Sequence, residues 1–232
     1  MYCLFAILFL IFLYFNYKIF IYRSYEFSND KSREKYSKGA LLERVEKKSL
    51  KILAFHMILS FTLFFFLSLW FSFGIEALIW SMALAGLGMA FIYDFLYRFI
   101  YLEDLGIILI LGLLINIDNL YESILSGFCY LLIMLIIYKM WDQATGEGDV
   151  YFAFIIGIFT KSYMFFYSML FAYVLAGIYG IFLFFIKKEN LKSEIPLASF
   201  MVLGLLLNLG GLWWLENSAY LTYMMKEFMH LK

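Results

Sequence analysis

The run Val150–Ile186 reads VYFAFIIGIFTKSYMFFYSMLFAYVLAGIYGIFLFFI and directly follows Gly146-Glu147-Gly148-Asp149. Its 37 residues are too many for one crossing of a bilayer, which takes about 20 residues in a helix. Lys161 interrupts the run, so we divide it there into two consecutive helices. The stretch therefore predicts a protein built from apolar helices with very short connections.

The composition of the whole chain supports this interpretation. Of its 232 residues, 65% are hydrophobic and 22% aromatic, with 28 Phe and only one Pro. A soluble domain of this size does not need so much apolar surface, whereas a bundle of spanning helices does. We predict an all-α membrane protein, a polytopic bundle of about eight transmembrane helices, with no nucleic-acid signature. The predicted spans are 2–22, 52–72, 75–96, 104–118, 121–140, 150–161, 163–186 and 196–215.

The only sizeable polar stretch lies between the first two predicted spans. Residues 1–51 are expected to hold an N-terminal span and a short cytoplasmic loop of alternating charges, and residues 52–232 a polytopic domain. Met1–Tyr17 lacks a basic n-region and a small-residue cleavage site, so we expect this first span to be retained.

The distribution of basic residues predicts the orientation in the inner, or cytoplasmic, membrane. With the N-terminus outside, only Lys161, Lys226 and Lys232 of the 18 Lys and Arg residues fall on the outer side. Because cytoplasmic loops are enriched in Lys and Arg, this orientation is favoured. Asp94 and Asp149 then both lie at the cytoplasmic face.

These two aspartates are the candidate catalytic residues. An ionisable group at a hydrocarbon boundary is costly and marks a functional site by default. Helical steps of four from each aspartate meet only small residues, which are Ala90 and Gly86 from Asp94, and Ala153 and Gly157 from Asp149. Because small residues let membrane helices approach closely, we expect the two stripes to pack against each other and bring the carboxylates together.

Two adjacent carboxylates predict hydrolysis by an activated water. The pair cannot ionise fully at low cost, so it is expected to hold one proton, with one member acting as base and the other as acid. No metal or cofactor is needed. Gly146 and Gly148 are expected to form a substrate-access loop, because they leave Asp149 unobstructed. We expect His56 and His230 to be structural, and Cys3 and Cys129 to be packing residues.

The motif Gly146-Glu147-Gly148-Asp149-Val150 resembles the GxGD motif of type IV prepilin peptidases and preflagellin peptidases. Two further stretches carry the resemblance, which covers residues 75–215. Ile100 follows Asp94 at the offset of the family's isoleucine, and the segment Ile195-Pro196-Leu197-Ala198-Ser199-Phe200-Met201-Val202-Leu203-Gly204 is similar to its Ile-Pro-x-x-x-Phe-x-x-x-Gly signature.

The resemblance implies an aspartic endopeptidase that removes the short leader of a prepilin or pseudopilin at the cytoplasmic face. This sequence departs from the family pattern at Tyr101, where the family has proline, and at Tyr151, where it often has lysine. The loop before residue 52 also lacks the paired Cys-x-x-Cys motifs of bifunctional members. We therefore expect peptidase activity without methyltransferase activity.

Two alternatives remain open. A membrane transporter or ion-pathway protein could use the aspartates to bind protons or cations, and an inactive family member could act as an assembly scaffold. The other nearby acids, which are Glu103, Asp104, Asp142 and Glu147, are interpreted as solvated boundary charges.

Overall fold

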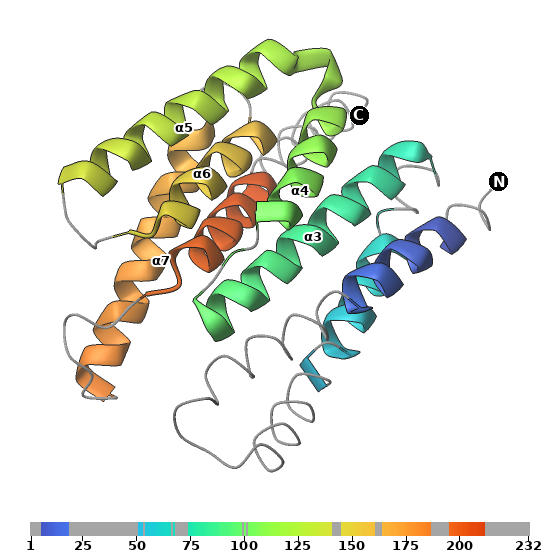
Figure 1. Ribbon diagram of the computed structural model, residues 1–232, viewed down its shortest axis with the longest axis horizontal. Coiled ribbons are helices and arrows are strands. Elements are labelled where there is room, and N and C mark those ends of the chain that lie inside the picture. Colours follow the sequence, from blue (N-terminus) through green and yellow to red (C-terminus); the bar gives the residue numbers. More distant parts are fainter. Residues whose placement is uncertain are drawn as a thin grey trace, which may run out of the picture. The chain divides into compact units, whose positions relative to one another are not determined.

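The computed structural model describes residues 6–18, 51–52, 54–65, 67, 74–98, 100, 102–140, 145–160, 164–186 and 195–211. Within these ranges all regular secondary structure is helical (Figure 1). The predicted all-α class is thereby confirmed for the described part of the chain. The loop between residues 19 and 50, Lys161, Asp142 and the C-terminal tail lie outside the described residues, so the predicted boundary at residue 51 stays a prediction.

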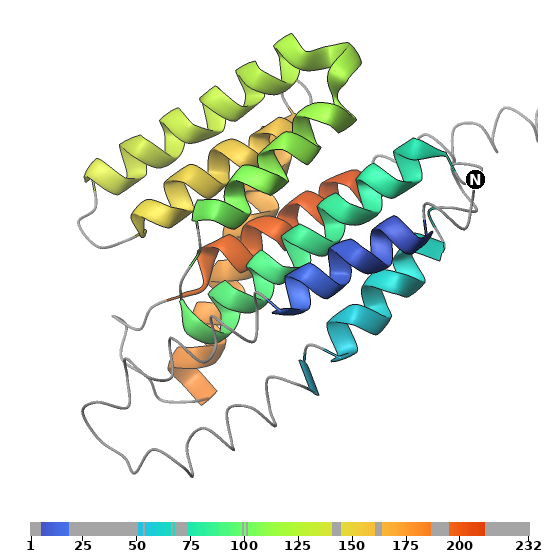
Figure 2. The ribbon, with the colours of Figure 1, turned by 45° about the vertical axis from the view of Figure 1, so that its right-hand side comes forward.

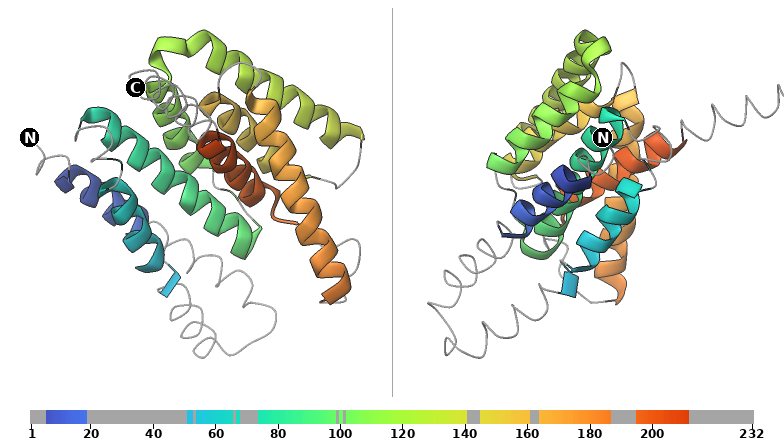
Figure 3. Two further views of the ribbon diagram at one scale, coloured as in Figure 1. Left: turned by 180° about the vertical axis from the view of Figure 1, so that it is seen from behind. Right: turned by 90° about the vertical axis from the view of Figure 1, so that its right-hand side faces the viewer.

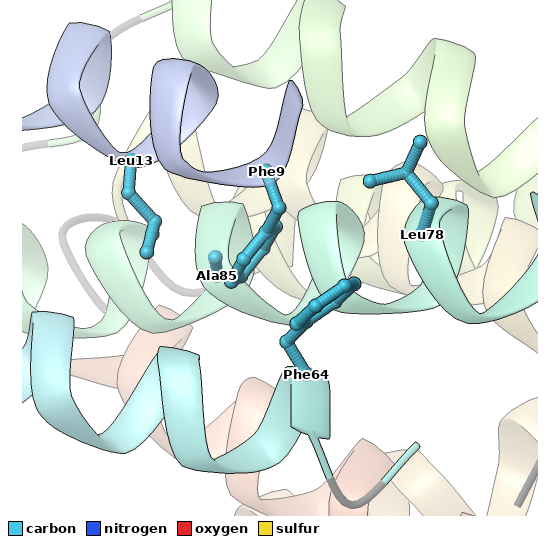
Figure 4. Packing of buried hydrophobic residues seen from close by; sticks show 5 residues of the cluster. All are labelled: Phe9, Leu13, Phe64, Leu78 and Ala85. Atoms are coloured by element: carbon cyan, nitrogen blue, oxygen red, sulfur yellow. The ribbon is translucent and has the colours of Figure 1, made fainter. Parts of the chain in front are cut away.

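The chain divides into two compact units, Met1–Met89 and Ala90–Lys232. The first unit contains the helices Ala6–Lys18 and Ala54–Phe65 and the first part of α3 (Ile75–Tyr97), which pack together. Their shared core consists of Phe9, Leu13, Phe64, Leu78 and Ala85, and the rings of Phe9 and Phe64 stack with centroids 4.7 Å apart (Figure 4).

The buried His56 joins two helices of this first unit. Its Nε2 lies 3.2 Å from the carbonyl oxygen of Ala85 and 3.5 Å from Ser60 Oγ. A Cβ at Gly88 would lie 2.8 Å from the same ring nitrogen, so glycine leaves the space that the imidazole fills. This geometry agrees with the structural role predicted for His56.

The second unit contains the end of α3 and the remaining helices. These are α4 (Leu102–Ile115), the short η1 (Ile117–Asn119), α5 (Leu120–Met140), α6 (Glu147–Phe159), α7 (Met164–Ile186) and a helix over Leu197–Gly211 (Figure 2). The bounds of α3 to α7 agree with the predicted spans to within a few residues. Apolar run length and interruptions are local properties, which is why the sequence locates these helices well.

The predicted division of the run Val150–Ile186 is confirmed, since α6 ends at Phe159 and α7 begins at Met164. The backbone becomes extended at Thr160, whose hydroxyl donates to the Gly157 carbonyl at 2.8 Å. The buried Asn116 donates to the Ile158 carbonyl at 2.9 Å. Side-chain donors thus satisfy carbonyls that the end of a helix leaves without backbone partners.

Helix α6 is held by close glycine contacts with its neighbours. A Cβ at Gly157 would lie 2.6 Å from the Gly127 Cα and 2.8 Å from the Ser126 carbonyl oxygen, so α5 and α6 run side by side at short range (Figure 1). The prediction that Gly157 approaches the span 75–96 is therefore wrong. Sequence periodicity identifies a small-residue face but does not identify the helix that packs against it.

The helix Leu197–Gly211 packs in the same manner against α7. A Cβ at Gly204 would lie 3.2 Å from Ala172 Cβ and would collide with the Ser168 carbonyl oxygen. Figure 3 (left) shows the two helices adjacent to each other. Gly204, singled out in the sequence signature, thus permits close packing that holds the N-terminus of this helix in place.

Three described helices are long and apolar enough to cross a membrane, namely Ile75–Tyr97, Ile117–Met140 and Met164–Phe185. Only 28% of the most apolar stretch of the second, and 22% of that of the third, is buried inside the protein. Large apolar side chains such as Ile136 and Phe185 therefore face outward. The remaining apolar helices are shorter, with 14 residues in α4 and 13 in α6.

Candidate functional site

Asp94 lies in the last turn of α3 and is 5% exposed. The helix ends at Tyr97, and the backbone N–H of the next residue, Arg98, donates to the Asp94 carbonyl at 2.9 Å. Arg98 has φ 57°, in the left-handed region that favours glycine. Its charge lies close enough to act on the Asp94 carboxylate.

Ser199 is the main hydrogen-bond partner of the Asp94 side chain. Its backbone N–H donates to Asp94 Oδ2 at 2.7 Å, and its hydroxyl lies 2.9 Å from the same oxygen. The hydroxyl is also 2.9 Å from the Phe91 carbonyl oxygen. Because a hydroxyl has only one proton, Ser199 can donate a hydrogen bond either to the carboxylate or to this carbonyl, but not to both at once.

Asp149 lies in the first turn of α6 and forms a reciprocal pair of hydrogen bonds with Gly146. The Asp149 N–H donates to the Gly146 carbonyl at 3.1 Å, and the Gly146 N–H donates to Asp149 Oδ2 at 3.0 Å. This arrangement satisfies donors that a helix N-terminus leaves without partners. Asp149 therefore has a structural role in capping its own helix, in addition to any chemical role.

The N-terminus of the helix Leu197–Gly211 connects the two aspartates. Pro196 precedes this helix and accepts the backbone N–H of Phe200 at 3.4 Å. The N–H groups of the first helical turn have no intrahelical acceptor. Here the Ser199 N–H donates to Asp94 Oδ2, and the neighbouring Ala198 N–H lies close enough to Asp149 to favour its negative charge. The positive end of this helix dipole also favours negative charge on both side chains.

The structure brings Asp94 and Asp149 together, since their carboxylates are close enough for their charges to repel each other. They meet at the N-terminus of a third helix, Leu197–Gly211, whereas Gly157 of one small-residue stripe packs against α5. The sequence signature Ile195–Gly204 contributes directly to this junction, because its proline precedes the helix that supplies the N–H groups.

Gly146 and Gly148 do not adopt a backbone conformation that only glycine allows. Gly146 has φ −80°, and none of the described glycines has positive φ. A Cβ at Gly148 would lie 3.7 Å from Ile100 Cβ, and one at Gly146 would lie 3.6 Å from Asp149 Oδ2, which are ordinary contacts. Nothing within the described residues therefore requires glycine here on steric grounds, and the role of both glycines in substrate access stays a prediction.

The other acids have separate surroundings. Glu147 accepts a hydrogen bond from the Tyr138 hydroxyl at 3.2 Å, whereas Glu103 and Asp104 lie in the first turn of α4. No group of three or more His, Cys, Asp and Glu side chains in the described ranges could hold a metal ion.

Sequence reasoning missed four residues of this site, which are Arg98, Tyr130, Ser199 and Tyr173. Ser199 had a detectable signal, because the third position after a helix-starting proline has a free N–H. Tyr130 and Tyr173 lie within apolar runs and come near Asp149 only in the folded protein. No local pattern distinguishes them from packing aromatics.

Comparisons of the chain with protein-family models, with curated proteins and with solved structures found no match.

Proposed function

We propose that this protein is an intramembrane aspartic endopeptidase that removes the leader of prepilin-like or pseudopilin-like proteins. The observation that supports the proposal most is the pairing of Asp94 and Asp149 at one helix N-terminus. Bringing two like charges close together is costly, and capping of α6 by Asp149 does not require a second carboxylate nearby. The substrate class rests on the resemblance of the three sequence motifs.

The proposed location is the cytoplasmic membrane. Three helices have the length and composition of spanning segments, and two of these present much apolar surface outward. Contiguous exposed apolar surface favours contact with lipid over contact with water. We keep the arrangement of about eight spans and the cytoplasmic site as part of this proposal, based on run lengths and the distribution of Lys and Arg.

The surroundings of the two aspartates suggest different roles for them. Asp94 receives the Ser199 N–H and hydroxyl and lies near the Arg98 charge, all of which stabilise a negative charge. Asp149 receives the Gly146 N–H, lies near the Ala198 N–H and faces the charge of Asp94. In the proposed mechanism Asp94 is therefore the general base and Asp149 carries the shared proton.

The proposed reaction is hydrolysis of one peptide bond. Asp94 takes a proton from water as the water oxygen bonds to the scissile carbonyl carbon, and the carbonyl oxygen takes the proton of Asp149. The C–N bond then breaks, the leaving nitrogen takes the proton held by Asp94, and a hydroxyl proton returns to Asp149. Both carboxyl groups end in their starting states, so the cycle needs no metal or cofactor.

The test is co-expression with candidate prepilins encoded in the same genome, with leader removal measured as a mass shift. Asp94→Asn and Asp149→Asn are each expected to abolish cleavage, because each removes an acid–base group while preserving shape. The matched control is Asp118→Asn, which changes an exposed aspartate of η1 and is expected to cleave normally.

Cleavage at near wild-type rate by either dyad variant would show that the aspartate assignment is wrong. Absence of cleavage by inserted wild-type protein, with every candidate prepilin, would contradict the proposed function. Flux measurements in proteoliposomes would then test the transporter alternative.

A further inference from the structure

Tyr130 of α5 has a buried hydroxyl without a hydrogen-bond partner among the described residues. The side chain is 0% exposed, and it is one of the largest fully buried side chains. Leaving a buried hydroxyl unpaired is destabilising, so such groups are rare in native proteins and call for an explanation. Phenylalanine would fill the same space without this penalty.

The position of Tyr130 suggests what the hydroxyl is for. Tyr130 lies on the buried face of α5 with Gly127 and Met134, close enough to Asp149 and Tyr173 for electrostatic interaction. The Tyr173 hydroxyl donates to Met134 Sδ at 3.0 Å, so that second hydroxyl already has a partner. Of these two tyrosines, only Tyr130 keeps a free donor beside Asp149.

Packing holds the Tyr130 ring in a defined place. Its centroid lies 6.3 Å from that of Phe165 on α7, and the adjacent turn of α5 is in close contact with α6 at Gly127. A donor fixed in this way does not have to reorganise when charge develops nearby, which is the basis of electrostatic stabilisation in enzymes.

We infer that the Tyr130 hydroxyl is a third catalytic group, a hydrogen-bond donor to the scissile carbonyl oxygen as it accepts the proton of Asp149. This inference rests on the proposed peptidase function. During addition of water, the π electrons of the carbonyl move onto its oxygen, and the Tyr130 O–H hydrogen-bonds to that oxygen without transferring its proton. The bond is made to the substrate, which explains why the hydroxyl has no partner among the described residues of the resting protein.

The test is Tyr130→Phe, which removes only the hydroxyl and retains the packing of the ring. We expect kcat for leader removal to fall about 100-fold with KM changed less than about twofold, as for loss of one oxyanion donor. The melting temperature should stay equal or rise, because an unpaired buried hydroxyl is removed. The matched control is Tyr121→Phe, the same change at an exposed position of α5, with no expected effect on either quantity.

The outcomes separate this inference from the proposed function. If wild type cleaves and Asp149→Asn does not, but Tyr130→Phe cleaves at the wild-type rate, only the role of Tyr130 is overturned. A lower melting temperature together with lost activity would assign Tyr130 a structural role and would also overturn it. If wild type cleaves no prepilin, the proposed function and this inference fail together.

Discussion

Ser199 is the residue on which the geometry of Asp94 depends most directly. It is fully buried, and it supplies both a backbone and a side-chain donor to one carboxylate oxygen. Its hydroxyl has a second acceptor in the Phe91 carbonyl. When Asp94 takes a proton in the proposed mechanism, the hydroxyl can turn to that carbonyl, so Ser199 is suited to both protonation states.

Replacing Ser199 by Ala should remove the side-chain donor and leave the backbone N–H in place. We expect the free energy of unfolding to fall by about 1.5–3 kcal/mol, the range for a lost hydrogen bond to a charged group. Leader removal should slow by about tenfold, because Asp94 loses one of its fixed donors. Denaturant unfolding and single-turnover cleavage measure the two effects.

The matched control for this change is Ser81→Ala. Ser81 is also buried and donates to a backbone carbonyl, that of Ala77, within the first unit of the chain. The Ser81→Ala variant should be less stable than wild type, but its folded fraction should cleave the leader at the wild-type rate. Equal cleavage by Ser199→Ala and wild type would contradict the role assigned to Ser199.

At the scale of elements, the contact between α5 and α6 determines where Asp149 lies. Gly157 allows the backbones to approach, and Asp149 sits two helical turns before it on the same helix. The helix Leu197–Gly211 is fixed in turn through Gly204 against α7. These contacts set the positions of the groups that meet at the dyad.

Gly157→Ala should be strongly destabilising, because its Cβ would lie 2.6 Å from the Gly127 Cα. A contact with backbone cannot be relieved by a rotamer change, and overpacking of this kind costs about 1–3 kcal/mol. The matched control is Gly148→Ala on the same helix, whose Cβ makes only ordinary contacts. Thermal unfolding in detergent should separate the two variants.

Gly148→Ala should keep its stability but lose leader removal, because a methyl group next to Asp149 would obstruct the proposed access of substrate. Unchanged thermal stability of Gly157→Ala would show that α5 and α6 are not packed as closely as described. Normal cleavage by Gly148→Ala would remove the substrate-access role of that glycine.

At the scale of the whole molecule, the proposed orientation places the end of α5 and the start of α6 in the cytoplasm. The beginning of α5 then lies on the outer side, with the exposed Asp118 of η1 beside it. This prediction follows from the distribution of Lys and Arg and from the order of the helices.

Single cysteines test this orientation in a variant in which Cys3 and Cys129 are replaced by Ser. A membrane-impermeant maleimide should label Asp118→Cys in cells whose cytoplasmic membrane is intact and whose outer layers admit the reagent. It should label Glu147→Cys only after the cytoplasmic membrane is permeabilised. Labelling of Glu147→Cys before permeabilisation would contradict the cytoplasmic location of the site. A cysteine at the exposed Glu103, near the start of α4, should behave like one at Glu147.

The sequence by itself determined the helical class, the positions of α3 to α7 and the two aspartates as the groups of interest. These features depend on local properties, which are the length of apolar runs, their interruptions and the cost of placing a charge at their ends. The break between α6 and α7 was predictable for the same reason, although Lys161 indicated it only approximately.

Only the tertiary structure decided which helix faces meet. It packed Gly157 against α5, directed the Ser199 N–H to Asp94 and brought the Ala198 N–H near Asp149. It also left the buried Tyr130 hydroxyl near Asp149 without a hydrogen-bond partner among the described residues. Small residues and apolar faces occur on most of these helices, so many pairings satisfy the local pattern equally well. The choice among them depends on the fit of all the helices together, which is not encoded at any single position.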